Sequence, residues 1–458
     1  MPQAAAGQFD DTDLTLKLAQ NSMSFTHDAL PTEAVEVARH CFLDWLGVTL
    51  AGASEPLTRI LLEEAVTAGG NSQATIIGDG RKLSMQQAAL INGSAAHVLE
   101  FDDIFRDAIY HPGAPVIAAA LAVSQSRHIA GEKFMRAVIT GYEVSGRIGT
   151  QMLPAHYQYW HPTGTVGSLG AAAACSVLLE LDTAATGHAI ANAATMAAGL
   201  QQAFRSDAMS KPLHAGRAAE TGVLTALAAS RGVTGAHDVL EGASGFGAAM
   251  SRDVDWDAVI SGLGESWAVN DMTQKNHACC GHTFAAVDSV LALHEEHGLS
   301  AANIARIHVA TYSTALEVAG NPDPKTEFEA KFSLPYCVAV ALVTGKARRA
   351  AFTEPWLFDK GLRELMTRVA LSVDSEADKN APAARAATVE IETTDGRRLS
   401  HYSPTRKGDP DNPLSDDELI EKFDELVIPV IGEAAAASLC DVLWRVDALD
   451  NMVDLRVV

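Results

Sequence analysis

Residues 31–52 read PTEAVEVARHCFLDWLGVTLAG, and the pattern of this stretch decides the fold class. Its apolar side chains recur at helical spacing and share one face, which consists of Val35, Ala38, Cys41, Phe42, Trp45 and Leu46. Pro31 stands where a helix can begin, because a proline in the first turn loses no intrahelical hydrogen bond. Gly47 and Gly52 loosen the other end. The stretch predicts a helix with one face against a core.

The same pattern of apolar residues at helical spacing extends from about residue 12 to about residue 251, with many alanines and with Gly, Pro or Asn between the predicted helices. It predicts an all-helical region, and the lack of a fixed period argues against a solenoid. Residues 160–179 carry no charged side chain but are rich in Gly, Ala and Ser. A membrane span needs about 20 predominantly apolar residues, so we expect a buried helix here.

The texture changes after about residue 300. Residues 302–313, 346–354 and 384–403 show alternation and β-branched side chains, which favour strands, and Asp395-Gly396 is typical of a tight hairpin turn. A capped helix is predicted from Ser415. The chain is therefore expected to be mostly α, with a large helical domain (1–265 and the C-terminal helices 406–458) and a smaller α+β domain (266–405) holding a short antiparallel sheet.

Charge and cysteine content exclude several classes of protein. The 458-residue, 48.3 kDa chain has 34 Lys and Arg against 57 Asp and Glu, a net charge of −23, which disfavours binding to nucleic acids or anionic membrane surfaces. The six cysteines show no regular spacing, and the first residues lack the features of a targeting segment. We expect a cytoplasmic protein.

Two segments of the helical half concentrate groups that transfer protons or hold anions. In HVLEFDDIFRDAIYHPGAP (97–115), His97, Asp102 and Asp103 lie at the end of an apolar helix, and His111 opens the next turn. Such a set suits acid–base chemistry or a metal, although a capping aspartate and an ordinary loop histidine would look the same. In HPTG (161–164), His161 and Thr163 stand at a helix start, whose free N–H groups attract carboxylates.

A third segment of this half, SKPLHAG, places Lys211 and His214 at the head of an alanine-rich helix. A lysine among apolar neighbours can shift its pKa toward neutrality and act as a proton donor or base, whereas a surface lysine is the ordinary alternative. None of the standard cofactor fingerprints, such as a Gly-rich dinucleotide loop or a phosphate loop, is present.

A dense cluster lies ahead of a later helix, where QKNHACCGHTF (274–284) contains Lys275, His277, Cys280 and His282. Thiolates and imidazoles are zinc ligands, but a four-ligand structural site normally needs a second cluster at a set spacing, and the sequence has none. We therefore predict no metal site here and treat these side chains as candidates for substrate contact.

Several blocks occur in one order along the chain and resemble the MmgE/PrpD family. They are DWLGVTLAG (44–52), NGSAAHVLEFDD (92–103), HPGAPVIAAALA (111–122), GYEVSGRIG (141–149), HPTGTVGSLGAAAA (161–174), SKPLHAGRAAETGVLTALAASRGVTG (210–235), EGASGFG (241–247) and EAKFSLPYCVAVAL (329–342). The family includes 2-methylcitrate dehydratase, cis-aconitate decarboxylase and iminodisuccinate epimerase. The resemblance implies a helical domain with a smaller α+β lid, a homodimer, an active site in the cleft between the domains, and chemistry without a metal or organic cofactor.

Carried over position by position, the resemblance also implies roles for individual residues. The expected catalytic residues are Lys211, His161, His111, Asp102 and Lys275, and the expected substrate-binding residues are Asp103, His214, Cys280, His282, His277 and Thr163. Which of Asp102 and Asp103 matches the family's aspartate is left open. Five residues after Lys275, where the decarboxylase branch resembles a Lys-x-x-x-x-His pattern, this chain has Cys280, which weakens the decarboxylase interpretation.

The three activities share one first step, the movement of a proton at a carbon next to a carboxylate. The first hypothesis is a lyase that removes water from a di- or tricarboxylate such as 2-methylcitrate. An epimerase of an iminodisuccinate-like dicarboxylate comes second and a cis-aconitate-type decarboxylase third. From other classes, a metal-dependent hydrolase using the same aspartates and histidines, or a binding module without catalysis, is the alternative.

Overall fold

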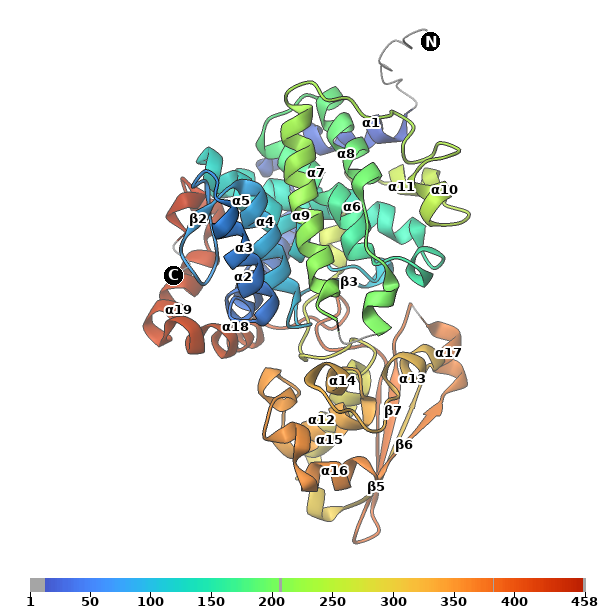
Figure 1. Cartoon of the computed structure of the whole chain (residues 1–458). Helices are drawn as coiled ribbons and strands as arrows, with labels where there is room; N and C mark the ends of the chain where they lie inside the picture. The colour runs from blue at the N-terminus through green and yellow to red at the C-terminus, as the bar shows by residue number, and fades with distance from the viewer. Residues whose placement is uncertain (1–12, 206–207, 382, 456–458) are drawn as a thin grey trace. The chain divides into compact units, whose positions relative to one another are not determined.

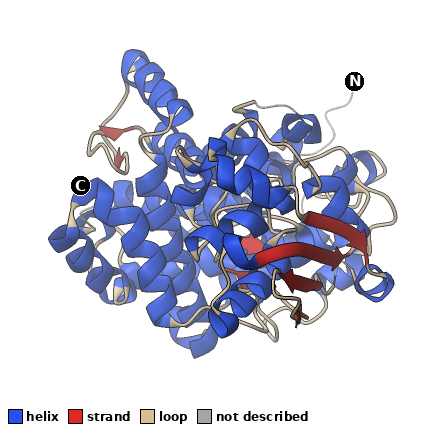
Figure 2. Cartoon of the chain, turned by 90° about the horizontal axis from the view of Figure 1, so that it is seen from below, coloured by secondary structure: helices blue, strands red, loops and turns tan. Residues whose placement is uncertain are grey.

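The computed structural model describes residues 13–205, 208–381 and 383–455, and the chain divides into two compact units. Met1–Thr273 and Ser415–Val458 make up the first unit, and Gln274–Leu414 the second (Figure 1). Helices predominate in the described residues, and the strands gather in small sheets (Figure 2). The predicted mostly-α class is therefore confirmed.

The first unit is helical apart from two very short strand pairs. Its helices are α1 (Leu14–Ser24), α2 (Thr32–Gly52), α3 (Pro56–Ala68), α4 (Met85–His97), α5 (Gly113–Arg127), α6 (Gly131–Met152), α7 (Pro162–Leu178), α8 (Thr183–Met196), α9 (Ser210–Ala229), α10 (Phe246–Met250), α11 (Trp256–Ile260), α18 (Asp416–Ile431) and α19 (Glu433–Leu443). Its strand pairs are β1 (Ala74–Thr75) with β2 (Lys82–Leu83), and β3 (Ile104–Phe105) with β4 (Met272–Thr273).

Helix α2 confirms the helix predicted at the start of the chain. It begins at Thr32, directly after Pro31, and its apolar face is buried. Gly47 and Gly52 do not loosen its end as expected but lie inside the helix, where they allow close packing. A Cβ atom at Gly52 would collide with the carbonyl oxygen of Ala95 in α4. Gly52 therefore brings α2 close to the helix that ends in His97, whereas Gly47 faces Phe423 and Leu426 of α18.

Helix α7 is the predicted uncharged helix, and every one of its residues is buried. It packs against α5, α6, α8 and α9, which surround it. Small residues make this possible, since the ideal Cβ of Gly170 would lie 2.6 Å from the carbonyl oxygen of Gly141 in α6. Among the described residues, no helix is long and apolar enough to cross a membrane.

The second unit combines helices with a four-stranded sheet. Its helices are α12 (Phe284–His297), α13 (Ser313–Ala319), α14 (Glu327–Lys331), α15 (Leu334–Thr344), α16 (Lys360–Met366) and α17 (Ser375–Asn380). Its strands are β5 (Ile304–Thr311), β6 (Val369–Val373), β7 (Ala387–Thr393) and β8 (Arg398–Ser403), in the order β6-β5-β7-β8. Helices α12 and α15 pack against the sheet.

Two details of the predicted sheet are wrong. The sheet is mixed, because β5 pairs parallel with β6 and antiparallel with β7. Residues 346–354 do not form a strand: Arg349–Phe352 is a short 3-10 helix in which the neighbours Ala351 and Phe352 are both buried, an arrangement that strand alternation does not produce. The hairpin at Asp395-Gly396 is present between β7 and β8, with Gly396 at φ +88°.

The units meet along the chain at 273/274 and 414/415, beyond the expected boundaries of 265/266 and 405/406. The first boundary lies after Thr273, later than expected, because Met272 and Thr273 pair with Ile104 and Phe105 of the helical unit. The second moves because Gly408 accepts a hydrogen bond from Gln274 inside the α+β unit. Helix α18 then begins as predicted, with Ser415 and Glu418 forming a capping box.

Candidate active site

The connection from α4 to α5 carries most of the acidic candidates. Helix α4 ends at His97, and the chain then runs through Glu100, Asp102 and Asp103 before α5 begins at Gly113. Glu100 has φ +58°, a left-handed conformation that is uncommon for a residue other than glycine. Such local strain persists only where surrounding contacts hold it.

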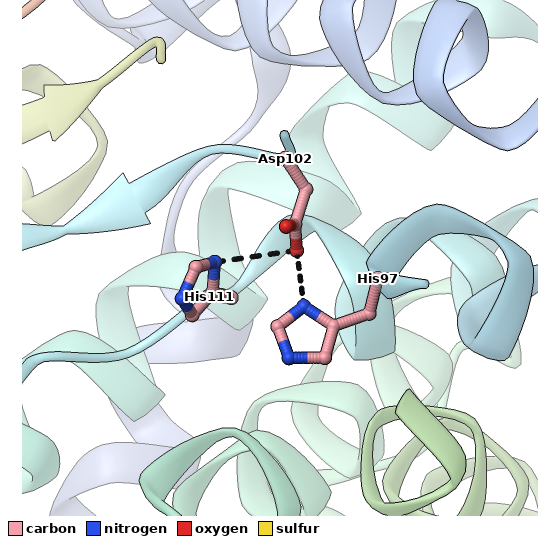
Figure 3. Close-up of side chains that lie close together, drawn as sticks. All are labelled: His97, Asp102 and His111. Carbon is pink, nitrogen blue, oxygen red and sulfur yellow. Dashed lines mark hydrogen bonds and ion pairs between the residues drawn. The ribbon is translucent and has the colours of Figure 1, made fainter. Parts of the chain in front are cut away.

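Asp102 lies between two imidazoles (Figure 3). Its Oδ2 is 2.7 Å from Nδ1 of His97 and 3.3 Å from Nδ1 of His111. All three side chains are buried. Burial alone would raise the pKa of Asp102, but the charges of and hydrogen bonds from His97 and His111 outweigh it and hold that pKa well below its usual value. Asp102 is therefore a carboxylate that orients both rings.

His161 and His214 form a second imidazole pair, with 3.2 Å between their Nδ1 atoms. The ring of His161 also stacks on that of His97, with centroids 5.5 Å apart. Burial, together with His97, Lys211, His214 and His111, lowers the pKa of His161 well below its usual value, and burial lowers the pKa of His214 to about 4. Both rings are neutral at pH 7 and can accept protons.

Lys211 lies in the first turn of α9, where it is buried and forms an ion pair with Glu100. Its Nζ is 5.0 Å from the centroid of the Phe204 ring, and that ring meets His161 edge to face. Lys211, Glu100 and His161 therefore belong to one cluster with the imidazoles. His97 was predicted to lie beside Asp102 and Asp103 at a helix end but was given no role, and Glu100 was not predicted as a site residue. Their only signal was their place in the LEFDD block and at the end of the preceding helix.

Two residues predicted to bind substrate have other partners. Asp103 accepts hydrogen bonds from the N–H of Gly113 (3.1 Å) and the hydroxyl of Tyr142 (2.7 Å), and burial raises its pKa to about 8. The hydroxyl oxygen of Thr163 accepts a hydrogen bond from the N–H of His111 (3.2 Å). Both residues therefore hold the α4–α5 connection in place, and their expected contact with the substrate stays a prediction.

The remaining candidates lie in the α+β unit, where His282 is half-buried and the others are buried. His277 Nε2 is 2.8 Å from an oxygen of Asp288, and His282 Nδ1 is 2.7 Å from the hydroxyl of Tyr312. Burial, with Arg385 and Arg406, lowers the pKa of His282 well below its usual value. Lys275 and Cys280 are buried as well, and the six cysteines are all free thiols. The catalytic role of Lys275 and the binding roles of its neighbours stay predictions.

The ligand atoms of His97, Asp102 and His111 lie within 4.8 Å of one another, so these residues could hold a metal ion. Two imidazoles and a carboxylate are a donor set that fits zinc or a similar ion. The same geometry is that of a carboxylate hydrogen-bonded to two histidines, which needs no metal.

An open pocket of about 520 Å³ lies in the helical unit beside this cluster. His214 and Arg217 line it together with Gly199, Gln202 and Thr221. Among the imidazoles of the cluster, His214 borders the pocket and contacts His161. The pocket therefore brings solvent to one end of the buried groups.

Comparison with known proteins shows the family. Residues 16–259 match the MmgE/PrpD N-terminal domain, and residues 277–446 match the MmgE/PrpD C-terminal domain. The chain belongs to the MmgE/PrpD family. The resemblance seen in the sequence is thereby confirmed.

Among the relatives of this MmgE/PrpD protein are two fungal proteins and one human protein. The chain is 26% identical over 485 residues to the cis-aconitate decarboxylase of Aspergillus terreus, covering 99% of this chain and 97% of that protein. It is 28% identical to a cis-aconitate decarboxylase-like protein of Aspergillus oryzae, covering 88% of each chain. The cis-aconitate decarboxylase of Homo sapiens is 27% identical, covering 92% of this chain and 89% of that protein.

Proposed function

We propose that this protein is a lyase that acts on a small tricarboxylate by transferring a proton at a carbon next to a carboxylate. The observation that carries the proposal is the buried cluster in which His97, Asp102 and His111 meet, with His161, His214 and the Lys211–Glu100 pair beside them. A single reaction of this kind needs a base, an acid and cations that stabilise an enolate-like intermediate.

The cluster offers each of these groups. His161 is neutral and buried, so it is our choice for the base. Lys211 is the proposed electrostatic partner of the substrate carboxylates, and the Asp102-oriented ring of His111 is the proposed proton donor to the departing group. These local cations and donors allow an anionic substrate to bind to a protein of net charge −23.

The pocket beside His214 supports a small anionic substrate. It is lined by Arg217, whose guanidinium can pair with a carboxylate, and by small residues such as Gly199 and Gly164. Its volume of about 520 Å³ is within the usual range for small-molecule sites.

We propose loss of water, as from 2-methylcitrate, as the net reaction. The sequence observation in its favour is Cys280. This residue stands five positions after Lys275, where the Lys-x-x-x-x-His pattern of the family's decarboxylases would place a histidine, so it weakens decarboxylation as the net reaction. Decarboxylation of cis-aconitate is the second candidate, because relatives over nearly the whole chain carry that name. Epimerisation of a dicarboxylate is the third.

The test is proton exchange in heavy water followed by NMR, with 2-methylcitrate, citrate, cis-aconitate and iminodisuccinate as substrates. Deuterium incorporation reports the shared first step, a new double bond reports loss of water, and released carbon dioxide reports decarboxylation. We expect His161→Ala and Lys211→Ala to reduce exchange about 10²-fold, and His237→Ala, at an exposed position, to leave it unchanged. Near-normal exchange in the first two variants would refute these roles.

We propose chemistry without a metal or organic cofactor. Metal dependence has to be tested, because a metal-dependent hydrolase would use His97, Asp102 and His111 as ligands. Metal analysis of the purified protein, with activity measured before and after a chelator, decides between them. Activity that is lost with the metal and restored by adding it back would overturn the cofactor-independent proposal.

We also propose a cytoplasmic homodimer. The six free thiols support a reducing compartment, and the family resemblance supports the dimer.

A further inference from the structure

Lys422 is a fully buried cation on α18, in the part of the chain that follows the α+β unit. Its Nζ lies 2.5 Å from Oδ1 of Asp44 in α2 and 2.8 Å from the carbonyl oxygen of Phe101. The same Nζ lies 3.9 Å from the centroid of the Phe101 ring. Helices α2 and α18 pack side by side, so the ion pair between Lys422 and Asp44 lies within their interface (Figure 1).

Phe101 is the residue between the two acidic side chains of the cluster. On one side is Glu100, which pairs with Lys211, and on the other is Asp102, which holds His97 and His111. The carbonyl group of Phe101 belongs to the peptide that leads directly to Asp102, and Glu100 precedes Phe101, so a shift of the backbone at Phe101 would displace both acidic neighbours. Lys422 binds that peptide at its carbonyl oxygen and also covers the Phe101 ring.

Stability alone does not explain a buried ion pair at this place. Removing two charges from water is costly, and a well-packed apolar pair of similar volume is often as stable or more stable. An apolar side chain at position 422 would fill the same space between α2 and α18, but it could not donate to the carbonyl oxygen of Phe101. Only a side chain with a hydrogen-bond donor, such as lysine, can bind this carbonyl oxygen and so hold the connection between α4 and α5.

We propose that Lys422 is a positioning residue of the active site, which holds the Glu100–Asp102 segment, with its left-handed Glu100, through the carbonyl oxygen of Phe101. Asp44 directs Lys422 through their ion pair. The inference rests on the proposed function, in that the positioned carboxylates belong to the proton-transfer cluster. It also gives the C-terminal helices a part in the site, although none of their residues belongs to the cluster.

The test uses a variant in which both charges are removed, so that neither is left buried alone. Asp44→Asn/Lys422→Met should fold with the thermal stability of the wild type or higher, while kcat falls about 10²-fold and KM changes little, because misplacement of catalytic groups affects the transition state most. Asp44→Asn alone keeps the contact of Lys422 with Phe101 and should retain most of kcat. A folded double variant with kcat within twofold of wild type would overturn the inference.

A matched control separates positioning from loose helix packing. Leu426→Ala shortens another buried side chain of α18, one that lies near Gly47 of α2, and leaves the hydrogen bond from Lys422 to Phe101 in place. It should lower stability and leave kcat nearly unchanged, and an equal loss of kcat would refute a specific role for Lys422. If the methionine double variant does not fold, Asp44→Asn/Lys422→Gln replaces it with the same expectation. Failure of both to fold, beside a folded Asp44→Asn, would assign Lys422 to stability and overturn the inference.

A readout without substrate distinguishes this inference from the proposed function. The Nδ1 proton of His97, held by Asp102 over 2.7 Å, should give a strongly deshielded signal in NMR of histidine-labelled protein. The signal should move or vanish in the Lys422 double variant and persist in Leu426→Ala. A protein that turns over none of the tricarboxylates but shows this pattern would disprove the function and support the positioning. An unchanged signal would disprove the positioning.

Discussion

Glu100 and Lys211 show how single residues build this site. Glu100 is an acidic residue in a left-handed conformation, which costs about 1–2 kcal/mol in a residue with a Cβ atom, and its carboxylate is buried. The ion pair with Lys211 compensates the buried charge on each side. The pair therefore fixes the first turn of α9 to the α4–α5 connection, next to His161.

The first prediction concerns this ion pair. Glu100→Gln keeps the size of the side chain but removes the charge that faces Lys211, so turnover should fall about 10²-fold. The chain contains a matched control in Glu180, which also has positive φ (+54°) and also pairs with a lysine, Lys133, but is exposed. Steady-state kinetics of Glu180→Gln should be unchanged. If Glu100→Gln and Glu180→Gln showed equal kinetics, Glu100 would have no role in catalysis.

The second prediction concerns Asp103, whose pKa of about 8 lies above the 3.8 of a free carboxyl group. Between about pH 4 and pH 8 the folded protein keeps a proton that the unfolded chain releases, so this group makes the free energy of unfolding decrease as pH rises through that window. The slope is on the order of 1 kcal/mol per pH unit. Above pH 8 it vanishes.

Asp103→Asn should remove this slope without loss of fold, because the amide oxygen can accept from Gly113 N–H while the amide N–H group donates to the oxygen of Tyr142, which reverses the bond that Tyr142 donates to Asp103. Thermal unfolding from pH 5 to pH 9 measures it, as the difference between variant and wild type. Buried histidines such as His156 act in the opposite direction below pH 6.5, and the difference cancels them. Asp107→Asn, at a neighbouring exposed carboxylate, should leave the wild-type curve unchanged. A slope that survives in Asp103→Asn would contradict the assignment.

At the scale of elements, two helices set the distance across the cluster. Helix α4 ends in His97 and α9 begins with Lys211 and His214, and the two pack in direct backbone contact at Gly216. A Cβ atom there would collide with the carbonyl oxygen of Leu90 and the hydroxyl of Ser94. The small residues of α9 are therefore part of the site geometry, although none of them takes part in chemistry.

The third prediction follows from this contact. Gly216→Ala should lower the free energy of unfolding by about 1–3 kcal/mol, because an overpacked interface must shift, and should reduce kcat by moving His97 away from Lys211. Gly361→Ala, on the exposed side of α16, should instead be neutral or stabilise the protein by about 0.5–1 kcal/mol. Urea unfolding and steady-state kinetics measure both variants. A stable, fully active Gly216→Ala protein would show that α4 and α9 adjust freely.

At the scale of the whole molecule, the chain leaves the helical unit at Thr273 and returns to it at Ser415. The α+β unit is thus an insertion, and α18 and α19 complete the helical unit. Two apolar side chains that line the open pocket, Met196 and Leu200, remain exposed. Exposed apolar side chains of this kind are typical of surfaces that meet another protein.

The fourth prediction is that the protein is a homodimer in solution, with a mass twice that of the 48.3 kDa chain. Light scattering after size-exclusion chromatography measures it. Because all six cysteines are buried and free, a reducing agent should not change the result. A monomer mass over the micromolar range would contradict the dimer.

The sequence by itself determined the class of fold, the family and most of the elements. Apolar residues at helical spacing predicted α2, the uncharged stretch predicted buried α7, and local turn and cap chemistry predicted the hairpin at Gly396 and the helix start at Ser415. These features depend on neighbours along the chain, so they can be recognised from it. The edge strand β6 was missed, since its partly buried residues show no alternation.

Only the tertiary structure decided which side chains share the site. It brought His97 and Glu100 into the cluster with His161 and Lys211, and it directed Asp103 to Tyr142 and Thr163 to the backbone of His111. The reason is physical: Asp102 and Asp103 are adjacent in sequence and chemically identical, yet the first meets two imidazoles and the second two neutral donors. Burial and partners then shift their pKa values in opposite directions. Contacts across helices that are distant in sequence set those partners.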